Sequence, residues 1–322
     1  MKKVLWILID NRMGSVGQAR GIAQHLNHEH FDIVEKPIDY TKLSGLPNFV
    51  RSKTLIGLTS ESKKAFHAPW PDMVLSISRR TVPVARYIKK NNPQTKLIQI
   101  MHPGESGLDE FSLVLLPEHD KDKPFHQNFR YLIGAPHRVT SDVLLQAKEK
   151  WKDTFKDLPK PLTAVIIGGA IKDRPFTIEN ARNLASKIVD FKKKTGGAVL
   201  LTTSRRTGEE AQKLILDALK DIPMHTFLWG DKSENPYLGY LACADNIIVT
   251  GDSVSMASEA CGTNKPVFVF EGQSWLTKKH YRFIHALYEN RYAVPLDLRY
   301  LKFMPSSSLN AAVDAAREIE RL

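Results

Sequence analysis

Short apolar runs alternate with amphipathic stretches along all 322 residues, and this alternation restricts the fold more than any other feature of the sequence. Residues 4–9 form one apolar run, and residues 16–26 follow with apolar side chains at helical spacing. Strands that take turns with helices are typical of a parallel sheet covered by helices on both faces. The sequence therefore predicts an α/β protein with doubly wound parallel sheets.

The alternation occurs in two series, and the chain is long enough for two domains. The first series predicts strands over residues 4–9, 73–77, 97–100, 113–116 and 131–133. The second predicts strands over residues 163–167, 198–202, 226–229, 246–250 and 267–270. Between the series, Pro159 and Pro161 restrict the backbone after a charged stretch at 141–156. We therefore expect a first domain at 1–157 and a second at 158–307, with a helix at 308–322 as a candidate addition to the first.

The composition excludes several classes of protein. With 42% hydrophobic and 25% charged residues, the chain is neither disordered nor collagen-like. Two cysteines, Cys243 and Cys261, are too few for a disulfide framework or a four-thiolate zinc site, so we expect a reducing compartment. The sequence shows no secretory signal and no apolar run long enough to cross a bilayer. We expect a cytoplasmic protein, with peripheral attachment to the inner membrane as an open alternative.

Positive charge is concentrated in one stretch of the chain. The sequence has 46 Lys and Arg against 35 Asp and Glu, a net charge of +11. Residues 51–100 hold ten of these cations against Glu61 and Asp72, which is +8 of the total. Such an excess indicates an anionic acceptor or an anionic membrane surface as partner, and a solvated lysine-rich face is the alternative. Nucleic acid is not expected, because no RNA-recognition or helix-turn-helix pattern occurs.

Three loops of the second series have residues suited to phosphate. Gly251 follows a predicted strand, Ser253 and Ser255 can cap the next helix, and free N–H groups at a helix start favour an anion. Glu259 lies about two turns into that helix. The loop after residue 167 contains Gly168, Gly169 and Lys172, and the loop after residue 202 contains Thr203, Ser204, Arg205 and Arg206. Simple turns and capped helices are the alternative, but the three loops together indicate a phosphate site.

Polar residues also follow each predicted strand of the first series. Asp10 ends the first strand and is the best-placed general base. His119 is a second candidate catalytic residue because histidine titrates near neutral pH, although surface histidines are commonly inert. The remaining candidates for an acceptor site or cleft are Arg12, Gly14, Gln18, Ser78, Arg79, Arg80, His102, Glu118, His137 and Arg138.

Motifs of other enzyme classes are missing from the sequence. It has no nucleophile elbow, no H-E-x-x-H and no C-x-x-C, and the glycine spacing of a dinucleotide-binding loop does not occur. We expect neither a bound metal nor a cofactor.

Eight segments resemble the mitochondrial fission "elongated mitochondria" family, in which some bacterial members are labelled predicted nucleoside-diphosphate-sugar epimerase. The resemblance covers nearly the whole chain. It departs at His102-Pro103, where Asp-Pro is expected, so a catalytic role does not carry over to His102. The matching segments are residues 6–10 with Arg12, Gly14, Gln18 and Gly21, then 78–85, 117–120, 134–138, 168–169, 202–207, 234–237 and 251–256.

The resemblance implies the GT-B architecture, with two Rossmann-like domains facing a cleft, the first for an acceptor and the second for a nucleotide-sugar. It implies that Ser253 and Ser255 hold the diphosphate and Glu259 the ribose, while Gly168, Gly169 and Lys172 line the cleft. The motif residues that complete this nucleotide-binding set are Asn235, Pro236, Tyr237, Asp252 and Met256.

Three functions remain open from the sequence. The first is a metal-independent glycosyltransferase of bacterial envelope polysaccharide or lipid-sugar synthesis, in which Arg205 or Lys172 stabilises the leaving diphosphate and Asp10 deprotonates the acceptor. The second is a nucleotide-sugar 2-epimerase. The third is a non-catalytic adaptor at a membrane, as the family name implies.

Overall fold

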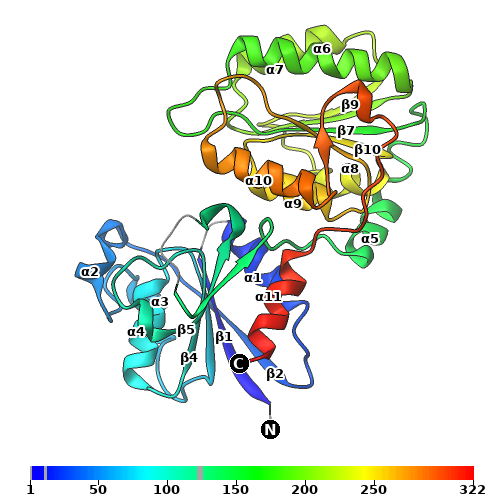
Figure 1. Cartoon of the computed structure of the whole chain (residues 1–322). Helices are drawn as coiled ribbons and strands as arrows, with labels where there is room; N and C mark the ends of the chain where they lie inside the picture. Colours follow the sequence, from blue (N-terminus) through cyan, green and yellow to red (C-terminus); the bar gives the residue numbers. More distant parts are fainter. Residues whose placement is uncertain (1, 11–12, 122–125) are drawn as a thin grey trace. The chain divides into compact units, whose positions relative to one another are not determined.

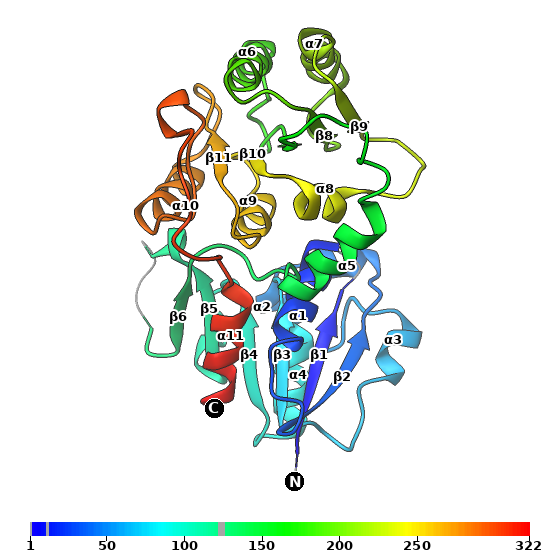
Figure 2. The same ribbon diagram turned by 90° about the vertical axis from the view of Figure 1, so that its right-hand side faces the viewer.

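The protein, seen in a computed structural model that describes residues 2–10, 13–121 and 126–322, forms two compact α/β units (Figures 1 and 2). The first unit comprises residues up to Arg138 together with Asn310–Leu322, and the second comprises Val139–Leu309. Each unit is built on a six-stranded sheet in which all paired neighbours are parallel. The predicted fold class, two Rossmann-like doubly wound units, is confirmed.

The sheet of the first unit has the strand order β2-β1-β3-β4-β5-β6. Its topology therefore reverses between β1 and β3, the place where open parallel sheets bind ligands. The strands are β1 (Lys3–Ile9), β2 (Phe31–Pro37), β3 (Met73–Ile77), β4 (Lys96–Ile100), β5 (Phe111–Pro117) and β6 (Phe129–Leu132). The helices and 3-10 turns are α1 (Met13–Ala23), η1 (Lys42–Gly45), α2 (Asn48–Arg51), α3 (Ser60–Lys64), α4 (Val82–Asn91), η2 (Leu108–Glu110), η3 (Glu118–Asp120) and α11 (Ala311–Glu320).

Both faces of this sheet are covered by packed apolar side chains. Successive side chains of a strand point to opposite faces, so consecutive residues of β1 belong to different clusters. Leu5 and Ile7 of β1 pack in a cluster that contains Ile22 of α1 and Ile319 of α11. Trp6 and its neighbour Leu8 belong to the opposite cluster, with residues of α4. The apolar run of β1 is thus continuous rather than alternating because it is covered on both sides.

The sheet of the second unit has the order β12-β11-β10-β7-β8-β9, so its topology reverses between β7 and β10. Figure 1 shows α6 and α7 on one face of this sheet and α8, α9 and α10 on the other. The strands are β7 (Thr163–Ile167), β8 (Val199–Thr203), β9 (Met224–Phe227), β10 (Asn246–Thr250), β11 (Val267–Phe270) and β12 (Val294–Pro295). The helices are α5 (Ser141–Trp151), α6 (Ile178–Thr195), α7 (Glu209–Leu219), α8 (Tyr237–Cys243), α9 (Val254–Cys261) and α10 (Lys278–Glu289), with the 3-10 turn η4 (Leu298–Tyr300).

The division between the units differs in position from the expected boundary at residues 157 and 158. The chain passes from one unit to the other after Arg138, so α5 lies in the second unit. The physical reason is packing: the Trp151 ring stacks on Phe155 at 6.0 Å, and a Cβ on Gly239 of α8 would come within 2.5 Å of Trp151. The helix α11 returns to the first unit. Across the described ranges, no helix is both long and apolar enough to cross a membrane.

Candidate functional site

A pocket of about 550 Å³ lies at the carboxyl ends of β8, β9 and β10 in the second unit. Loops and helix starts that follow strands of a parallel sheet converge at this edge, where ligands of such sheets bind. The pocket wall combines the end of β8, the loop after β9 and the beginnings of α8 and α9. The residues predicted for nucleotide binding that line it are Thr203, Ser204, Asn235, Tyr237, Ser253, Ser255, Met256 and Glu259.

A tyrosine and a glutamate form the polar centre of this pocket. The Tyr237 hydroxyl donates a hydrogen bond to Oε2 of Glu259 at 2.5 Å. Burial raises the pKa of the Glu259 carboxyl, and the hydrogen bond from Tyr237 opposes that rise. Burial and the adjacent carboxylate also raise the pKa of Tyr237 well above its ordinary value, so the phenol stays a neutral donor. This pair fixes the direction of the Glu259 side chain.

The start of α9 gives the pocket an anion-binding character. The Ser253 side chain caps the helix by accepting from the Met256 N–H at 3.4 Å, and the first turn contains no acidic residue. Ser255 also lines the pocket. The N–H groups of a first helical turn carry a partial positive charge, so this wall favours a negatively charged group.

An exposed tryptophan completes the pocket wall, and the sequence analysis did not predict it. Trp229 follows β9, has 62% of its surface exposed, and is held by its backbone N–H, which donates to Thr203 Oγ1 at 2.9 Å. Asp231 stabilises the same loop by accepting from the Leu228 N–H at 2.7 Å. The available signal in the sequence was a large aromatic residue at the carboxyl end of the strand predicted over residues 226–229.

Asp252 occupies the point where the second sheet reverses its topology. Its Oδ2 accepts from the Gly169 N–H at 2.8 Å and pairs with Arg206 at 2.9 Å, while Oδ1 accepts from Thr250 at 2.7 Å. A Cβ on Gly168 would lie 2.2 Å from Oδ2 of Asp252. Burial raises the pKa of Asp252, whereas the Thr250 hydrogen bond and Arg206 oppose the rise. The carboxylate thus joins the loops after β7, β8 and β10.

Gly168 and Gly169 let the side chain of Asp252 and the backbone of Arg206 approach closely. We had expected the space beside these glycines to admit a ligand. A Cβ on Gly169 would lie 2.0 Å from the Arg206 carbonyl oxygen, and Arg206 also donates to the Ala170 carbonyl at 2.8 Å. Lys172 and Arg205 are exposed. The predicted residues that lie outside the pocket lining are Gly168, Gly169, Lys172, Arg205, Arg206, Pro236 and Asp252.

His280 of α10 adds a titratable group beside Asp252 that the sequence analysis missed. Its Nδ1 lies 2.7 Å from the Thr277 hydroxyl, in the cap of α10. Burial lowers the pKa of His280, a hydrogen bond to the Asp252 backbone opposes this, and the nearby Arg206 and Arg174 lower it further. The imidazole is therefore biased toward its neutral form.

In the first unit, Asp10 and Ser78 lie at the reversal point between β1 and β3. Both residues are buried, and the Ser78 hydroxyl donates to Oδ2 of Asp10 at 3.3 Å. Ser78 has a φ of 76°, a conformation that non-glycine residues rarely adopt and that concentrates at functional sites. The structure thus brings together two of the predicted residues at a position suited to ligand binding.

The other predicted residues of the first unit are spread over several strand ends. Arg12 lies outside the described residues. Gln18 and His137 are buried, and a Cβ on Gly21 would lie 2.4 Å from the His137 carbonyl oxygen. His102 accepts from the Gly104 N–H at 3.1 Å. Glu118 pairs with Lys121, and His119 lies in η3. The exposed or half-exposed members are Gly14, Arg79, Arg80 and Arg138.

The cations of residues 51–100 do not form one free surface. Arg51 is fully buried, and its guanidinium donates to backbone carbonyls. Arg86 and Lys53 both pair with Glu110, at 2.7 and 3.1 Å. Lys89 donates to the Thr95 carbonyl at 2.7 Å. Much of the local charge therefore stabilises the fold.

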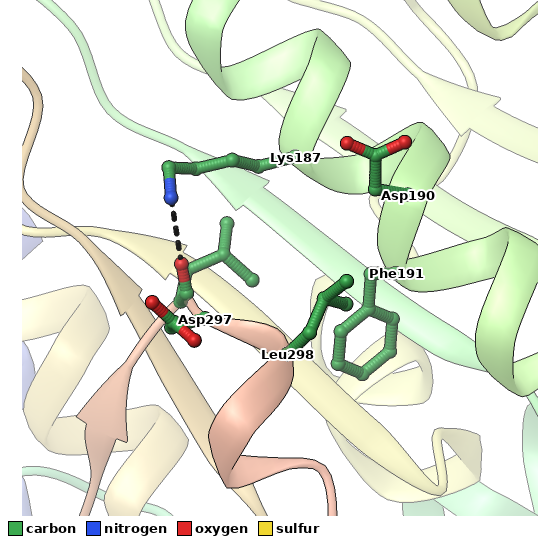
Figure 3. Close-up of a pocket in the computed structure, with 6 residues that line it drawn as sticks. Lys187, Asp190, Phe191, Asp297 and Leu298 are labelled. Atoms are coloured by element: carbon green, nitrogen blue, oxygen red, sulfur yellow. Dashed lines mark hydrogen bonds between the residues drawn. The ribbon is translucent and has the colours of Figure 1, made fainter.

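A smaller pocket of about 260 Å³ lies between α6 and η4 (Figure 3). Its Lys187 ammonium donates to the Leu296 carbonyl at 3.1 Å. The exposed Arg299 pairs with Asp297, with 3.0 Å between Nε of the arginine and Oδ1 of the aspartate. Hydrogen bonds from Arg299 lower the pKa of the Asp297 carboxyl to about 2. Because these polar groups are used within the protein, we place the candidate site in the larger pocket.

Within the described ranges, no group of three His, Cys, Asp or Glu side chains is placed to hold a metal ion.

Comparisons with known proteins agree with this architecture. The model of a family described as "Mitochondrial fission ELM1" matches residues 13–322. A mitochondrial fission protein ELM1 of Arabidopsis thaliana is 30% identical over 235 residues, which are 66% of this chain and 54% of the plant protein. The chain thus spans about half the length of this curated relative.

Solved structures with the same fold cover nearly the whole chain. UDP-GlcNAc 2-epimerase from Methanocaldococcus jannaschii superposes with a TM-score of 0.60 at 12% identity, covering 99% of this chain and 100% of that one. Acinetobacter baumannii MurG gives a TM-score of 0.53 at 13% identity, with 99% of each chain covered. At such low identity the likeness establishes the GT-B fold alone.

Proposed function

The chain belongs to the mitochondrial fission ELM1 family, and we propose that its second unit binds the nucleoside diphosphate part of a nucleotide-sugar in the pocket around Glu259. The observation that carries the proposal is the Tyr237–Glu259 hydrogen bond in the same pocket as the start of α9. A carboxylate that accepts hydrogen bonds from hydroxyl groups suits the ribose of a nucleoside diphosphate, and a helix start that attracts an anion suits its diphosphate.

Each wall of the pocket suits one part of that ligand. The exposed ring of Trp229 offers a face on which a base can stack. Tyr237 occupies Oε2 of Glu259, so Oε1 is the oxygen that accepts from the ribose hydroxyls. The N–H groups of α9 with Ser253 and Ser255 receive the diphosphate, and Arg205 or Lys172 adds positive charge. Asp252 and Arg206 position the loops without contacting the ligand.

The reaction that we favour is glycosyl transfer to an anionic, lipid-linked sugar acceptor of envelope synthesis at the cytoplasmic face of the inner membrane. Asp10, held by Ser78, is the base that removes the proton of the acceptor hydroxyl as that oxygen forms its bond to the sugar. The bond to the diphosphate breaks, and α9 stabilises the charge that develops on the leaving group. His119 is the alternative base. Arg79, Arg80 and Arg138 supply positive charge for the acceptor.

Binding of nucleoside diphosphates tests the proposal directly. Thermal shift and calorimetry with UDP, GDP, ADP and CDP should find one that binds the wild-type protein. Glu259→Ala should weaken that binding about tenfold or more, because the hydrogen bonds of a buried carboxylate to ribose are lost. Glu179→Ala is the matched control, since Glu179 is exposed at the start of α6 in the same unit and should leave binding unchanged. If none of the four nucleotides binds, the adaptor function becomes the better explanation.

The fold also suits a nucleotide-sugar 2-epimerase, as in the solved M. jannaschii structure. An epimerase needs no acceptor and exchanges a sugar proton with solvent. Incubation with the bound nucleotide-sugar in deuterium oxide, without acceptor, separates the two reactions. Deuterium in the recovered sugar would support epimerisation and contradict transfer as the main activity.

A further inference from the structure

A group of large apolar side chains is exposed on one short segment of the first unit. Leu43 is 55% exposed, Phe49 72% and Val50 50%, and Leu46 and Ile56 are also exposed. We call these five residues the apolar loop. Elsewhere in the described part of the first unit, Met101 is the one large hydrophobic residue with comparable exposure. Clustered exposed apolar side chains mark a surface that contacts an apolar partner.

The segment is inverted relative to an ordinary surface helix. In α2, Asn48 and Arg51 are buried, whereas Phe49 and Val50 face outward. Exposing the apolar side and burying the polar side costs free energy in water, so the arrangement favours a non-aqueous partner. Figure 1 shows α2 at the outer edge of its unit.

Hydrogen bonds hold the apolar loop in this inverted arrangement. Arg51 donates to the carbonyls of Ile56 at 3.0 Å, Ser44 at 3.4 Å and Arg80 at 3.2 Å. Asn48 donates to the Arg79 carbonyl at 3.0 Å. The buried polar side chains thus join both ends of the segment to the loop after β3. The apolar side chains are presented by a built structure, because their outward direction is set by these bonds.

The charges around the apolar loop match an anionic surface. Lys42 and Arg79 are exposed, whereas the nearby Lys53 is paired with Glu110. No acidic residue occurs from residue 40 to residue 60 of the sequence. Exposed apolar side chains flanked by cations are the combination that binds bilayers containing anionic lipids, because the cations attract the headgroups while the apolar groups enter the boundary below them.

We propose that the apolar loop inserts into the surface of a bilayer that carries anionic lipids, with Lys42 and Arg79 at the level of the headgroups. The inference is independent of the nucleotide pocket, which lies in the other unit. It also differs from the expectation that residues 51–100 as a whole form the docking face, because several cations of that stretch are used within the fold.

Vesicle co-sedimentation tests this proposal. The wild-type protein should bind vesicles of phosphatidylcholine mixed with phosphatidylglycerol, and should bind pure phosphatidylcholine vesicles much less. The double variant Phe49→Ser with Val50→Ser should reduce binding to the mixed vesicles about tenfold or more, because two apolar side chains no longer enter the bilayer. Leu145→Ser is the matched control, since Leu145 is 61% exposed on α5 of the second unit.

The outcomes separate the membrane from other partners. Circular dichroism and thermal unfolding should show that the double variant folds as the wild-type protein does, because both side chains are exposed. Equal binding of the wild-type protein and the double variant would overturn the proposal, as would a wild-type protein that binds neither vesicle. Sedimentation velocity identifies the other occupant: a wild-type dimer that the double variant converts to monomer, without vesicle binding, would assign the apolar loop to a second copy of the chain.

Discussion

The Glu259 carboxyl is held in surroundings that disfavour its charge, and this affects both binding and stability. Its pKa is raised by burial, so the folded protein binds this proton more readily than the unfolded chain does. The free energy of unfolding therefore falls as the pH rises from the ordinary pKa of glutamate to the raised pKa of Glu259 in the folded protein. A ligand whose hydroxyl groups donate hydrogen bonds to the ionised carboxylate offsets this cost, as we propose for ribose.

Lys192 is the opposite case, a buried amine in the second unit. Its Nζ donates to Thr163 Oγ1 at 3.1 Å and to the carbonyls of Pro161 and Ala198 at 3.3 Å. Burial lowers its pKa from the ordinary 10.5 to about 8. Between these two values the unfolded chain keeps a proton that the folded protein has released. Lys192 therefore makes the protein more stable as the pH rises through this range.

We predict that Lys192→Met removes this pH dependence. Between about pH 8.5 and 10, the free energy of unfolding should rise with pH less steeply in the variant than in the wild-type protein. The difference between the two slopes should be up to about 1 kcal/mol per pH unit. Urea denaturation at several pH values measures the slopes. Lys193→Met is the control, because the neighbouring Lys193 is exposed and should keep the wild-type slope. Identical slopes for the wild-type protein and Lys192→Met would contradict the assigned pKa.

At the scale of the elements, hydrogen bonds join β7 and β10 at their carboxyl ends. The Gly168 N–H donates to Thr250 Oγ1 at 2.8 Å, and the next N–H, that of Gly169, binds Asp252. Both strands were predicted from their apolar runs, because the run of each strand is local in the sequence. Their adjacency was not predictable in that way, because β8 and β9 lie between them in the sequence and the pairing of distant strands leaves no local pattern.

We predict that Gly168→Ala destabilises the second unit by about 1–3 kcal/mol, because the added Cβ displaces the Asp252 carboxylate from its hydrogen bonds. Thermal unfolding of the second unit gives the measurement. Gly17→Ala in α1 provides the comparison: it adds a methyl group where no atom lies within 4 Å, and it should be neutral or stabilising. A Gly168→Ala protein as stable as the wild type would show that the loop can move aside.

The strand β2 and the helix α10 are among the elements that the sequence analysis did not predict, for different physical reasons. The edge strand β2 has charged side chains at Asp32, Glu35 and Lys36 and is half exposed, so its apolar pattern is weak. The helix α10 buries Phe283 and Ile284 but begins with two lysines, within a stretch where no element was predicted. Elements at the margin of a sheet receive less burial, and so their patterns are weaker.

For the whole molecule, the last helix returns the chain to the unit in which it began. Ala312, Ala315, Ala316 and Ile319 of α11 are buried in a cluster with residues of α1 and the first sheet. The Asn27 N–H also donates a hydrogen bond to Oε1 of Glu320 in this helix at 2.8 Å. The stability of the first unit therefore depends on residues 310–322, which the whole second unit, Val139–Leu309, separates in the sequence from the rest of the first unit.

We predict that Ile319→Asp lowers the stability of the first unit by about 3–5 kcal/mol, because it buries an unpaired charge and leaves a cavity. Nucleotide binding by the second unit should persist. Calorimetry with and without the bound nucleotide follows both units. Arg317→Ala, an exposed change on the same helix, should have little effect. If Ile319→Asp both destabilises the first unit and abolishes nucleotide binding by the second unit, the two units do not fold independently.

The sequence alone determined the layered α/β architecture, the presence of two series of strands and the loops that hold polar residues. These features follow from periods of a few residues and from the rule that loops after parallel strands share one edge. It also predicted Ser253, Tyr237 and Glu259, which do line one pocket. Their role with nucleotide remains a prediction.

The tertiary structure alone decided which of those polar residues face a pocket and which face the protein. Asp252 and Gly168 have the sequence context of a phosphate loop, yet they contact each other across the reversal of strand order between β7 and β10. Arg51 belongs to the basic stretch, yet it is buried and turns Phe49 outward. The reason is that burial depends on contacts between segments far apart in the chain, and no local pattern of residues contains that information.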